Sequence, residues 1–545
     1  MITIFDGTKN VPKVPDKHLY QSNTFRLMKY CYTMSCPEGD IIYNHLTGKT
    51  VLVPNESISD FIKTGYSVLN WFSVPIDFNE DNYFHTEPFS QRLINEEEIE
   101  KSNIEALIRA LYVAYLKEKK ISKKRESLYT KDQIDSWVSK YGSPLYIFRK
   151  DDFIEAFNRL RETFQREYPK HQIAYSYKTN YTPEICKTVK ELGGFAEVVS
   201  DFELEIARKV GYKDSQIIYN GPCKGDCMDQ FLLNGGLLNV DNVDELTRIL
   251  DVAQKHPEVV IEFGVRLNFD IGQDYASRFG IDATDESLNE VIEVISNVAN
   301  LKLVGLHFHL GELNINSWKL RAYQMIRIID KYFPHGLKYV DIGSGMHERN
   351  FYDKSLPNIN DIRSLDNYAV AAIRPFLDYF KNIPDEHKPL LITEPGTLLV
   401  KDCIDFITTV KTIKRNQGEM YVVTDGSKFN LGTESYFDHR PILIVSSASP
   451  TKHKFKDASI VGYTCMESDK LFVGFNGQLG VSDYIVFGDV GAYSSVEKPP
   501  FIMPNCTMLC IDKAGETLIK RAESYEYLLE TYVLTDLEKS YDRKE

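Results

Sequence analysis

The sequence lacks the features that mark membrane, secreted and nucleic-acid-binding proteins. It has no uninterrupted apolar run of about 18 residues, so we expect no membrane-spanning helix and no membrane partner. The opening residues, MITIFDGTKNVPKVPDKH, contain no apolar segment of secretory length, so we expect no signal peptide. The net charge of -14 argues against a nucleic-acid partner, because phosphate binding needs a basic surface. Together these absences favour a cytoplasmic enzyme.

Paired cysteine motifs are also missing. The 9 cysteines are scattered, and the pairs Cys223/Cys227 and Cys506/Cys510 have a spacing that differs from the C-x-x-C of zinc and redox sites. We expect these residues to be structural thiols in a reducing compartment. A structural zinc ion is the less favoured alternative.

The chain of 545 residues is long enough for several domains. Residues 1–125 form a block that ends in EEEIEKSNIEALIRALYVAYLKEKK, whose apolar residues recur at helical spacing. Residues 126–150 are expected to be a linker and strand that enter the main fold. Residues 151–395 alternate apolar and amphipathic segments. Residues 396–545 contain many short strand patterns and are expected to form a mainly β domain.

The alternating segments predict a (β/α)8 barrel. The candidate strands, including one just before residue 151, are LYIF at 145, IAYSY at 173, AEVV at 196, IIYN at 217, LLNV at 237, FGVRLN at 263, LVGLHFH at 303, YVDIG at 339 and LLITEP at 390. Helical patterns lie between most of them, and such repeats over about 250 residues are typical of a barrel. A doubly wound open sheet is the alternative. In a barrel, the carboxyl ends of the strands carry the chemistry, and there the sequence has Lys178, Arg266, His309, Gly343 and Glu394.

Four of these strand ends have chemically distinct character. Lys178 stands alone in AYSYKTNYTP and is either a surface amine or an amine that forms an imine. The loop DIGSGM, from Asp341 to Met346, has the glycines that free backbone N–H groups for phosphate. Glu394 begins EPGT, and HFHLGE places His307 and His309 on one face of a strand.

These groups form a set that suits one cofactor. A lysine amine, a phosphate loop, a histidine that stacks on a ring and a carboxylate together hold pyridoxal phosphate. A metal ion bound by the two histidines is the alternative, but the sequence offers no third ligand at convincing spacing, so we expect no metal.

Many ordered motifs support this interpretation. They are YGSPLYIF, YSYKTN, EVVSDFE, NGPCK, VDNVDEL, VRLN followed by SRFGI, GLHFHLG, DIGSG, EPG, Cys465-x-x-x-Asp469 and GDVGAYS. In this order they resemble the fold-type III pyridoxal-phosphate decarboxylases, the diaminopimelate and ornithine decarboxylase family, over residues 126–510. The resemblance implies an alanine-racemase-like barrel, a β domain and a head-to-tail homodimer with active sites at its interface.

The resemblance also implies roles for individual residues around the cofactor. Lys178 would be the Schiff-base lysine, His309 would stack on the ring, and Glu394 would pair with the ring nitrogen. The remaining cofactor-binding positions would be Gly343, Ser344, Gly345, Gly396, Thr397 and Tyr493.

Further matching positions imply contacts with the substrate. Arg266 matches the family arginine near cofactor and substrate, and Arg440 in HRPILI resembles the arginine that holds a substrate carboxylate. Cys465, contributed by the partner subunit, would protonate the substrate carbon after carbon dioxide leaves. Met466 and Asp469 complete the expected substrate positions.

The sequence departs from the family pattern at four positions. Thr397 replaces an arginine that helps to bind phosphate, Ser344 replaces the middle glycine of the phosphate loop, and Glu312 replaces a serine. Met466 replaces a carboxylate that reads the distal amine or its surroundings. A catalytically inactive regulatory homologue is therefore one alternative, and a racemase, which would not need the Cys465 motif, is another.

These departures bear on the substrate. Glu467, next to Met466, would face the other way on a strand, and Ile444 replaces the tyrosine of the R-P-x-L-Y motif. We therefore expect decarboxylation of a non-standard, conjugated or tethered amino acid. A free diamino acid such as diaminopimelate is the alternative.

Residues 1–125 are an addition to the family pattern. Two short strand patterns flank a turn at Thr47-Gly48, and a short helix and a further strand-like segment are expected after them. This stretch resembles the small N-terminal modules of some radical-SAM peptide-modifying enzymes, which help to engage a leader peptide. We expect either a module that binds a peptide or carrier protein, or an extension that packs on the barrel or the dimer.

Overall fold

The computed structural model describes two parts of the chain. The larger comprises residues 128–272, 276–311, 315–346, 365–432, 440–446 and 451–533, and the smaller consists of five short strands before residue 76. These belong to two compact units, which are described separately. The expected helix over residues 96–120 and the segments after the Thr47-Gly48 hairpin, apart from one short strand, lie outside the described residues.

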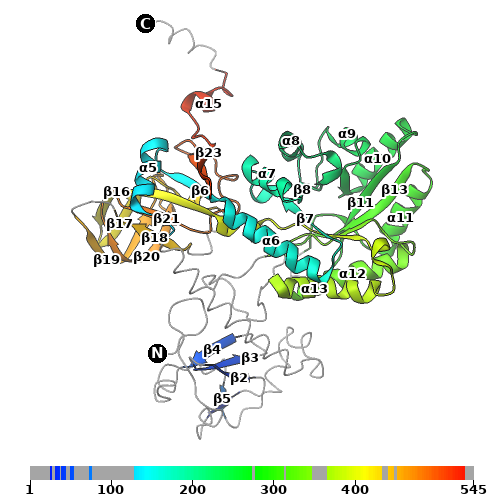
Figure 1. Ribbon diagram of the computed structural model, residues 1–545, viewed down its shortest axis with the longest axis horizontal. Helices are drawn as coiled ribbons and strands as arrows, with labels where there is room; N and C mark the ends of the chain where they lie inside the picture. Colours follow the sequence, from blue (N-terminus) through cyan, green and yellow to red (C-terminus); the bar gives the residue numbers. More distant parts are fainter. Residues whose placement is uncertain are drawn as a thin grey trace. The chain divides into compact units, whose positions relative to one another are not determined.

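Within the described residues, eight parallel strands close into a barrel (Figure 1). Their order around the barrel is β10, β9, β8, β7, β15, β14, β13 and β11, and the β10–β11 pairing closes it. The strands are β7 (His171–Ser176), β8 (Phe195–Val198), β9 (Ile217–Tyr219), β10 (Leu237–Val240), β11 (Ile261–Asn268), β13 (Leu301–His307), β14 (Tyr339–Asp341) and β15 (Leu390–Thr393). A short strand, β12 (Ile281–Asp282), pairs with β11. The predicted barrel is confirmed, and eight of the nine candidate strands form it.

Helices lie around the barrel strands (Figure 1). They are α6 (Lys150–Glu167), α7 (Pro183–Glu191), α8 (Asp201–Lys209), α9 (Met228–Leu233), α10 (Val243–Lys255), α11 (Asp285–Ser296), α12 (Ile315–Tyr332) and α13 (Leu365–Phe380). Three of them begin with a side chain that accepts a backbone N–H, namely Ser200, Asn242 and Thr284. These caps satisfy amides that the first helical turn leaves unpaired, and they fix where each strand-to-helix loop ends.

The barrel interior is filled by side chains from several strands. Ala174, Ile218, Val304, Tyr339 and Ile392 form one buried cluster. Two glycines on neighbouring strands make room for the tyrosine, because a Cβ at Gly264 or at Gly305 would lie within 2.2 Å of Tyr339 atoms. The barrel is therefore a packed core, with its polar residues concentrated at the carboxyl ends of the strands.

The rest of the larger unit is a mainly β domain, as predicted. Its strands are β6 (Leu145–Arg149), β16 (Ile404–Asn416), β17 (Glu419–Thr424), β18 (Ile442–Val445), β19 (His453–Val461), β20 (Lys470–Leu479), β21 (Tyr484–Phe487), β22 (Thr507–Asp512) and β23 (Gly515–Lys520). Three short helices accompany them: α5 (Lys131–Tyr141), α14 (Thr397–Val400) and α15 (Tyr525–Leu529).

Strand β6 differs from its prediction. The segment LYIF at 145 was expected beside the barrel strands, but β6 pairs antiparallel with β16 and parallel with β22. All five of its residues are buried. A short, fully buried strand has no polar face in its sequence that would indicate which of two sheets it joins.

The smaller unit contains a three-stranded antiparallel sheet. Strand β3 (Gly39–Asn44) pairs with β2 (Cys31–Cys36) and with β4 (Lys49–Val53), and a separate pair joins β1 (Phe25–Leu27) to β5 (Ser73–Pro75). The two strands predicted on either side of the Thr47-Gly48 turn are confirmed as β3 and β4. In the described parts of the chain, no helix is long and apolar enough to cross a membrane.

Candidate active site

Lys178 lies directly after β7, in a 3₁₀ turn over Tyr177–Thr179 at the carboxyl end of the barrel. Its Nζ donates to Glu197 Oε2 over 2.8 Å. Burial alone would lower the pKa of the Lys178 amine, but the Glu197 and Glu394 carboxylates outweigh burial and raise that pKa above its ordinary value. Lys178 is therefore a carboxylate-paired amine at the barrel mouth and not a free surface lysine.

A network of buried amides holds the two carboxylates in place. Asn220, which follows β9, donates from Nδ2 to Glu197 Oε1 over 3.1 Å and also donates to Glu394. Its Oδ1 accepts from Asn239 Nδ2 over 2.9 Å, and Asn239 Oδ1 accepts from the Tyr339 hydroxyl over 2.7 Å. Such a connected network fixes charged groups before any ligand arrives.

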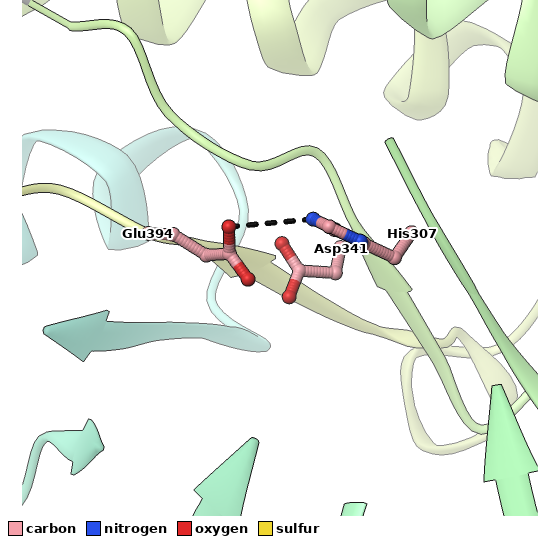
Figure 2. A group of neighbouring side chains, drawn as sticks. All are labelled: His307, Asp341 and Glu394. Carbon is pink, nitrogen blue, oxygen red and sulfur yellow. Dashed lines mark hydrogen bonds and ion pairs between the residues drawn. The ribbon is translucent and has the colours of Figure 1, made fainter. Parts of the chain in front are cut away.

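Glu394 sits beside His307 and Asp341 (Figure 2). Glu394 Oε2 lies 3.3 Å from His307 Nε2, and all three side chains are buried. Burial and the nearby Glu394 carboxylate raise the pKa of Asp341 well above its ordinary value. Burial would also raise the pKa of Glu394, but His307 and Lys178 lower it below the ordinary value. At neutral pH we therefore expect Asp341 to carry a proton and Glu394 to be ionised.

This cluster also bears on the metal alternative. One ligand atom from each of His307, Asp341 and Glu394 lies within 4.8 Å of the others, a grouping that could hold a metal ion. The sequence offered no convincing third ligand beside His307, and the structure supplies Asp341 and Glu394 in that place. A metal ion bound there would compete with a cofactor ring nitrogen for the Glu394 carboxylate.

His309 lies two residues after His307, just beyond the end of β13. Its Nδ1 accepts the Ser344 N–H over 3.1 Å, which places the ring proton on Nε2. Burial and the charge of Lys178 lower the pKa of His309 well below its ordinary value. A neutral imidazole therefore lies next to the glycine loop. Glu312, three residues further on, lies outside the described residues.

The glycine loop runs from Asp341 to Met346. Gly343 has φ +63°, and a Cβ there would lie 2.6 Å from the Phe308 carbonyl oxygen, so only glycine fits. After Asp341, four loop amides have partners: Ile342 N–H donates to the Ile392 carbonyl, Gly343 N–H to Asp341 Oδ1, Ser344 N–H to His309 Nδ1, and Met346 N–H to Ser344 Oγ. Among the loop amides that the structure describes, the Gly345 N–H alone has no acceptor. It suits an incoming phosphate oxygen.

The turn that contains Gly396 packs against the turn that contains Lys178. A Cβ at Gly396 would lie 1.9 Å from Thr179 Oγ1, so the two turns approach closely. Tyr493 lies against the Lys178 turn, because its N–H donates to the Thr179 carbonyl over 3.0 Å and its hydroxyl accepts from Thr179 Oγ1 over 3.5 Å. Thr397 is the first residue of α14. Of the predicted residues, Gly396 and Tyr493 thus lie next to the Lys178 turn, and Thr397 follows Gly396 in the chain.

Arg266 at the end of β11 braces the His309 loop. Its Nη2 donates to the His309 carbonyl over 3.3 Å, and its Nη1 lies 3.5 Å from Asp241 Oδ1. The guanidinium lies over the Phe279 ring at 4.6 Å. Its Nε is buried without a hydrogen-bond partner among the described residues. Arg266 therefore has a donor left for a further acceptor.

Cys465 and Met466 lie on the loop between β19 and β20. Both are exposed, with Met466 at 40% of its full accessibility. Asp469 is buried and pins this loop. Its Oδ2 accepts from Thr464 N–H and Oγ1 over 3.1 and 2.7 Å, and its Oδ1 accepts from the Lys428 N–H over 2.7 Å. With its oxygens so engaged, Asp469 is placed to position Cys465, and a substrate contact by Asp469 stays a prediction.

Arg440 is buried at the start of the segment that leads into β18. Its Nη2 donates to the Leu431 carbonyl over 3.5 Å, and its Nε lacks a partner within the described residues. Its predicted contact with a substrate carboxylate stays a prediction.

The sequence did not indicate three of these groups. Glu197 stands within the motif EVVSDFE, and the sequence alone assigns no role to Glu197, Asn220 or Asp341. Each is a polar residue at or just after a barrel strand. The predicted (β/α)8 fold could have indicated these residues, because it brings the carboxyl ends of all eight strands to the same end of the barrel.

The residues present fit pyridoxal 5'-phosphate. Lys178 supplies an amine for the aldehyde, and an ionised Glu394 supplies a partner for a protonated ring nitrogen. The loop amide of Gly345 is available for phosphate, and the neutral ring of His309 lies next to it. This set of amine, carboxylate, imidazole and loop amide meets the needs of that cofactor.

Comparisons with known proteins agree with this chemistry. Residues 154–401 match the family model described as "Pyridoxal-dependent decarboxylase, pyridoxal binding domain". The diaminopimelate decarboxylase of Aquifex aeolicus is 24% identical over 410 residues, covering 72% of this chain and 91% of that protein. The diaminopimelate decarboxylase of Methanocaldococcus jannaschii is 25% identical over 420 residues, with the same coverage of 72% and 91%.

Solved structures share the fold. The M. jannaschii diaminopimelate decarboxylase in complex with L-lysine has a TM-score of 0.64 at 23% identity, covering 74% of this chain and 94% of that chain. The lysine decarboxylase of Selenomonas ruminantium has a TM-score of 0.58 at 19% identity, covering 74% and 98%. Residues 154–401, which hold the barrel with its lysine, its glycine loop and its ionised carboxylate, thus match the pyridoxal-binding domain of pyridoxal-dependent decarboxylases, and 72% of the chain is similar to a diaminopimelate decarboxylase.

Proposed function

We propose that this protein removes the α-carboxylate of an amino acid as carbon dioxide, with pyridoxal 5'-phosphate held at Lys178, and that its substrate has no free distal ammonium group. The observation that carries the proposal is the Lys178 amine, 2.8 Å from Glu197 at the barrel mouth and electrostatically coupled to Glu394. An amine at such a site captures an aldehyde once it loses its proton.

Each residue has one task in this proposal. The bound cofactor supplies a ring that accepts the electron pair of the breaking bond between Cα and the carboxylate. Glu394, kept ionised by His307 and Lys178, would hold a proton on the ring nitrogen. The neutral imidazole of His309 would stack on the ring, and Arg266 keeps the His309 loop in place through the His309 carbonyl.

The proposed proton donor is Cys465, acting in the active site of a partner subunit. Its exposure on a loop of the β domain supports this role, and Asp469 holds that loop in shape.

A homodimer in which each active site contains residues of both subunits can be tested by mixing two inactive variants. Chains with Lys178→Ala and chains with Cys465→Ala would each be inactive alone, whereas random mixing would restore about one quarter of the full rate. No recovery on mixing would contradict the shared site.

The substrate proposal depends on Met466. A free distal ammonium group in the substrate needs an anionic partner, because an unpaired charge is costly to bury. Met466 offers an apolar, partly exposed side chain at the position where the family carries a carboxylate. A conjugated, tethered or otherwise non-standard amino acid would need no such partner.

A free diamino acid is the second candidate substrate. It is favoured by the relatives, since those of A. aeolicus and M. jannaschii are named diaminopimelate decarboxylases. Carbon dioxide release from a panel of free diamino acids, N-acylated diamino acids and short peptides separates the candidates. Faster turnover of the free diamino acids would reject the first substrate class and leave the decarboxylase function intact.

We also propose that residues 1–125 bind a peptide or carrier that presents the substrate. Within the described strands of this unit, β2 and β4 form the edges of the three-stranded sheet, and an extended peptide can add to such an edge. The test compares KM for one amino acid given free and given linked to a carrier peptide. We expect the linked form to have a KM lower by at least about tenfold, and equal values would contradict the proposal.

A further inference from the structure

One buried arginine lies directly behind the glycine loop. Arg321, on α12, is fully buried. Its Nη1 donates to the Ser344 carbonyl over 3.0 Å, and its Nη2 donates to the Leu310 carbonyl over 2.8 Å. The guanidinium also lies over the Trp318 ring at 4.4 Å, which fixes its plane. Arg321 therefore ties the glycine loop to the loop that contains His309.

The contact between Arg321 and the Ser344 carbonyl affects the neighbouring Gly345 N–H. The Ser344 carbonyl and the Gly345 N–H belong to the same peptide group. A charged donor on the carbonyl polarises that peptide and makes its N–H a stronger donor. The Gly345 N–H is also the described loop amide without an acceptor. Arg321 thus strengthens the one amide of this loop that remains available to a phosphate oxygen.

A positive charge is needed at this place for a second reason. Thr397 occupies the position at which related decarboxylases have an arginine that helps to bind phosphate, and a threonine side chain supplies no charge. Charge-assisted contacts to phosphate are about twice as strong as neutral ones. We propose that Arg321 is the cationic support of the cofactor phosphate in this protein, acting through the Ser344–Gly345 peptide and through its own charge behind the loop.

This inference rests on the cofactor of the proposed function and concerns only its phosphate. Arg321 is a positioning residue, because it reaches the cofactor through another group. The test therefore compares two ligands of the cofactor-free protein, pyridoxal 5'-phosphate and pyridoxal, which differ only in the phosphate. Affinity is measured by quenching of intrinsic fluorescence, so that no activity of the loaded enzyme is needed.

We expect Arg321→Gln to weaken pyridoxal 5'-phosphate binding by at least about tenfold and to change pyridoxal binding by less than about twofold. Arg327→Gln is the matched control, because Arg327 lies on the same helix and is exposed. Adding Thr397→Arg to Arg321→Gln should restore part of the preference for the phosphorylated ligand, because it returns a cation to the other side of the site.

Equal weakening of both ligands, or no weakening of either, would overturn the inference. If Arg321→Gln does not fold, Arg321→Lys replaces it. The lysine keeps the charge but cannot hold both carbonyls, so we expect a smaller loss of the preference, and an unchanged preference would again overturn the inference. Failure of the unaltered protein to bind either ligand would instead reject the proposed function.

Discussion

The ion pair between Glu197 and Lys178 leads to a quantitative prediction about when the Lys178 amine can react. An amine attacks an aldehyde only in its uncharged form, and the Glu197 carboxylate stabilises the charged form at 2.8 Å. Glu197→Gln keeps the size and most hydrogen bonds of the side chain while removing its charge. We therefore expect the substitution to lower the pKa of Lys178, so that the cofactor is captured at lower pH.

The size of the effect follows from the geometry. Two unit charges 2.8 Å apart interact by about 6 kcal/mol at an effective dielectric constant of about 20. The Lys178 side chain is 33% exposed, so solvent screens part of this interaction. We take half of it, roughly 3 kcal/mol, which corresponds to about 2 pKa units.

The assay follows capture of the cofactor aldehyde by the cofactor-free protein. The rate of the absorbance change is measured across a pH series, and its midpoint reports the pKa of Lys178. We expect the Glu197→Gln midpoint to lie about 2 pH units below that of the unaltered protein. Glu205→Gln, a charge removal on the partly exposed helix α8, is the control. A midpoint that does not move in Glu197→Gln would refute the coupling between Glu197 and Lys178.

Three further predictions concern stability, the Cys465 loop and the substrate. Burial lowers the pKa of His171 to about 3 in the folded protein. Above pH 6.5 the side chain is uncharged in both the folded and the unfolded chain, so the fold has its full stability. At pH 5 only the unfolded chain binds the proton, so the free energy of unfolding falls by about 2 kcal/mol. Urea unfolding at both pH values should show this loss, and an equal loss in His171→Gln would contradict it. Asp469→Asn should slow decarboxylation by at least about tenfold without weakening cofactor binding, because it loosens the loop of Cys465; a full rate would exclude a positioning role. Met466→Glu should raise kcat/KM for free diamino acids by about tenfold or more, and a fall would contradict the assignment of this position.

The strand pattern was enough to predict the barrel. The eight barrel strands were all recognisable from short apolar runs separated by helical patterns, because each parallel strand is buried on both faces. The same property explains why the prediction assigned β6 to the wrong sheet. Its sequence, like theirs, is apolar throughout, and only its pairing with β16 and β22 shows that it belongs to the β domain.

The residues of the candidate site likewise include some that the sequence indicates and some that it does not. Lys178, His309 and Glu394 were predictable because each stands within a local motif of unusual composition. Glu197 and Asn220 were not, because neither stands out from its neighbours in the chain. Their importance arises only when β8 and β9 pair and bring Glu197 within 3.1 Å of Asn220. Contacts between neighbouring strands that are distant in the sequence carry no local signal.

The central claim is that Lys178 makes this protein a pyridoxal-phosphate-dependent decarboxylase. The most direct test incubates the unaltered protein and Lys178→Ala with pyridoxal 5'-phosphate and a panel of amino acids labelled at the α-carboxylate, and measures released carbon dioxide. We predict cofactor-dependent release by the unaltered protein from at least one conjugated or free amino acid, and none above background by Lys178→Ala. Release that is equal in the two proteins, or absent from both across the panel, would contradict the claim.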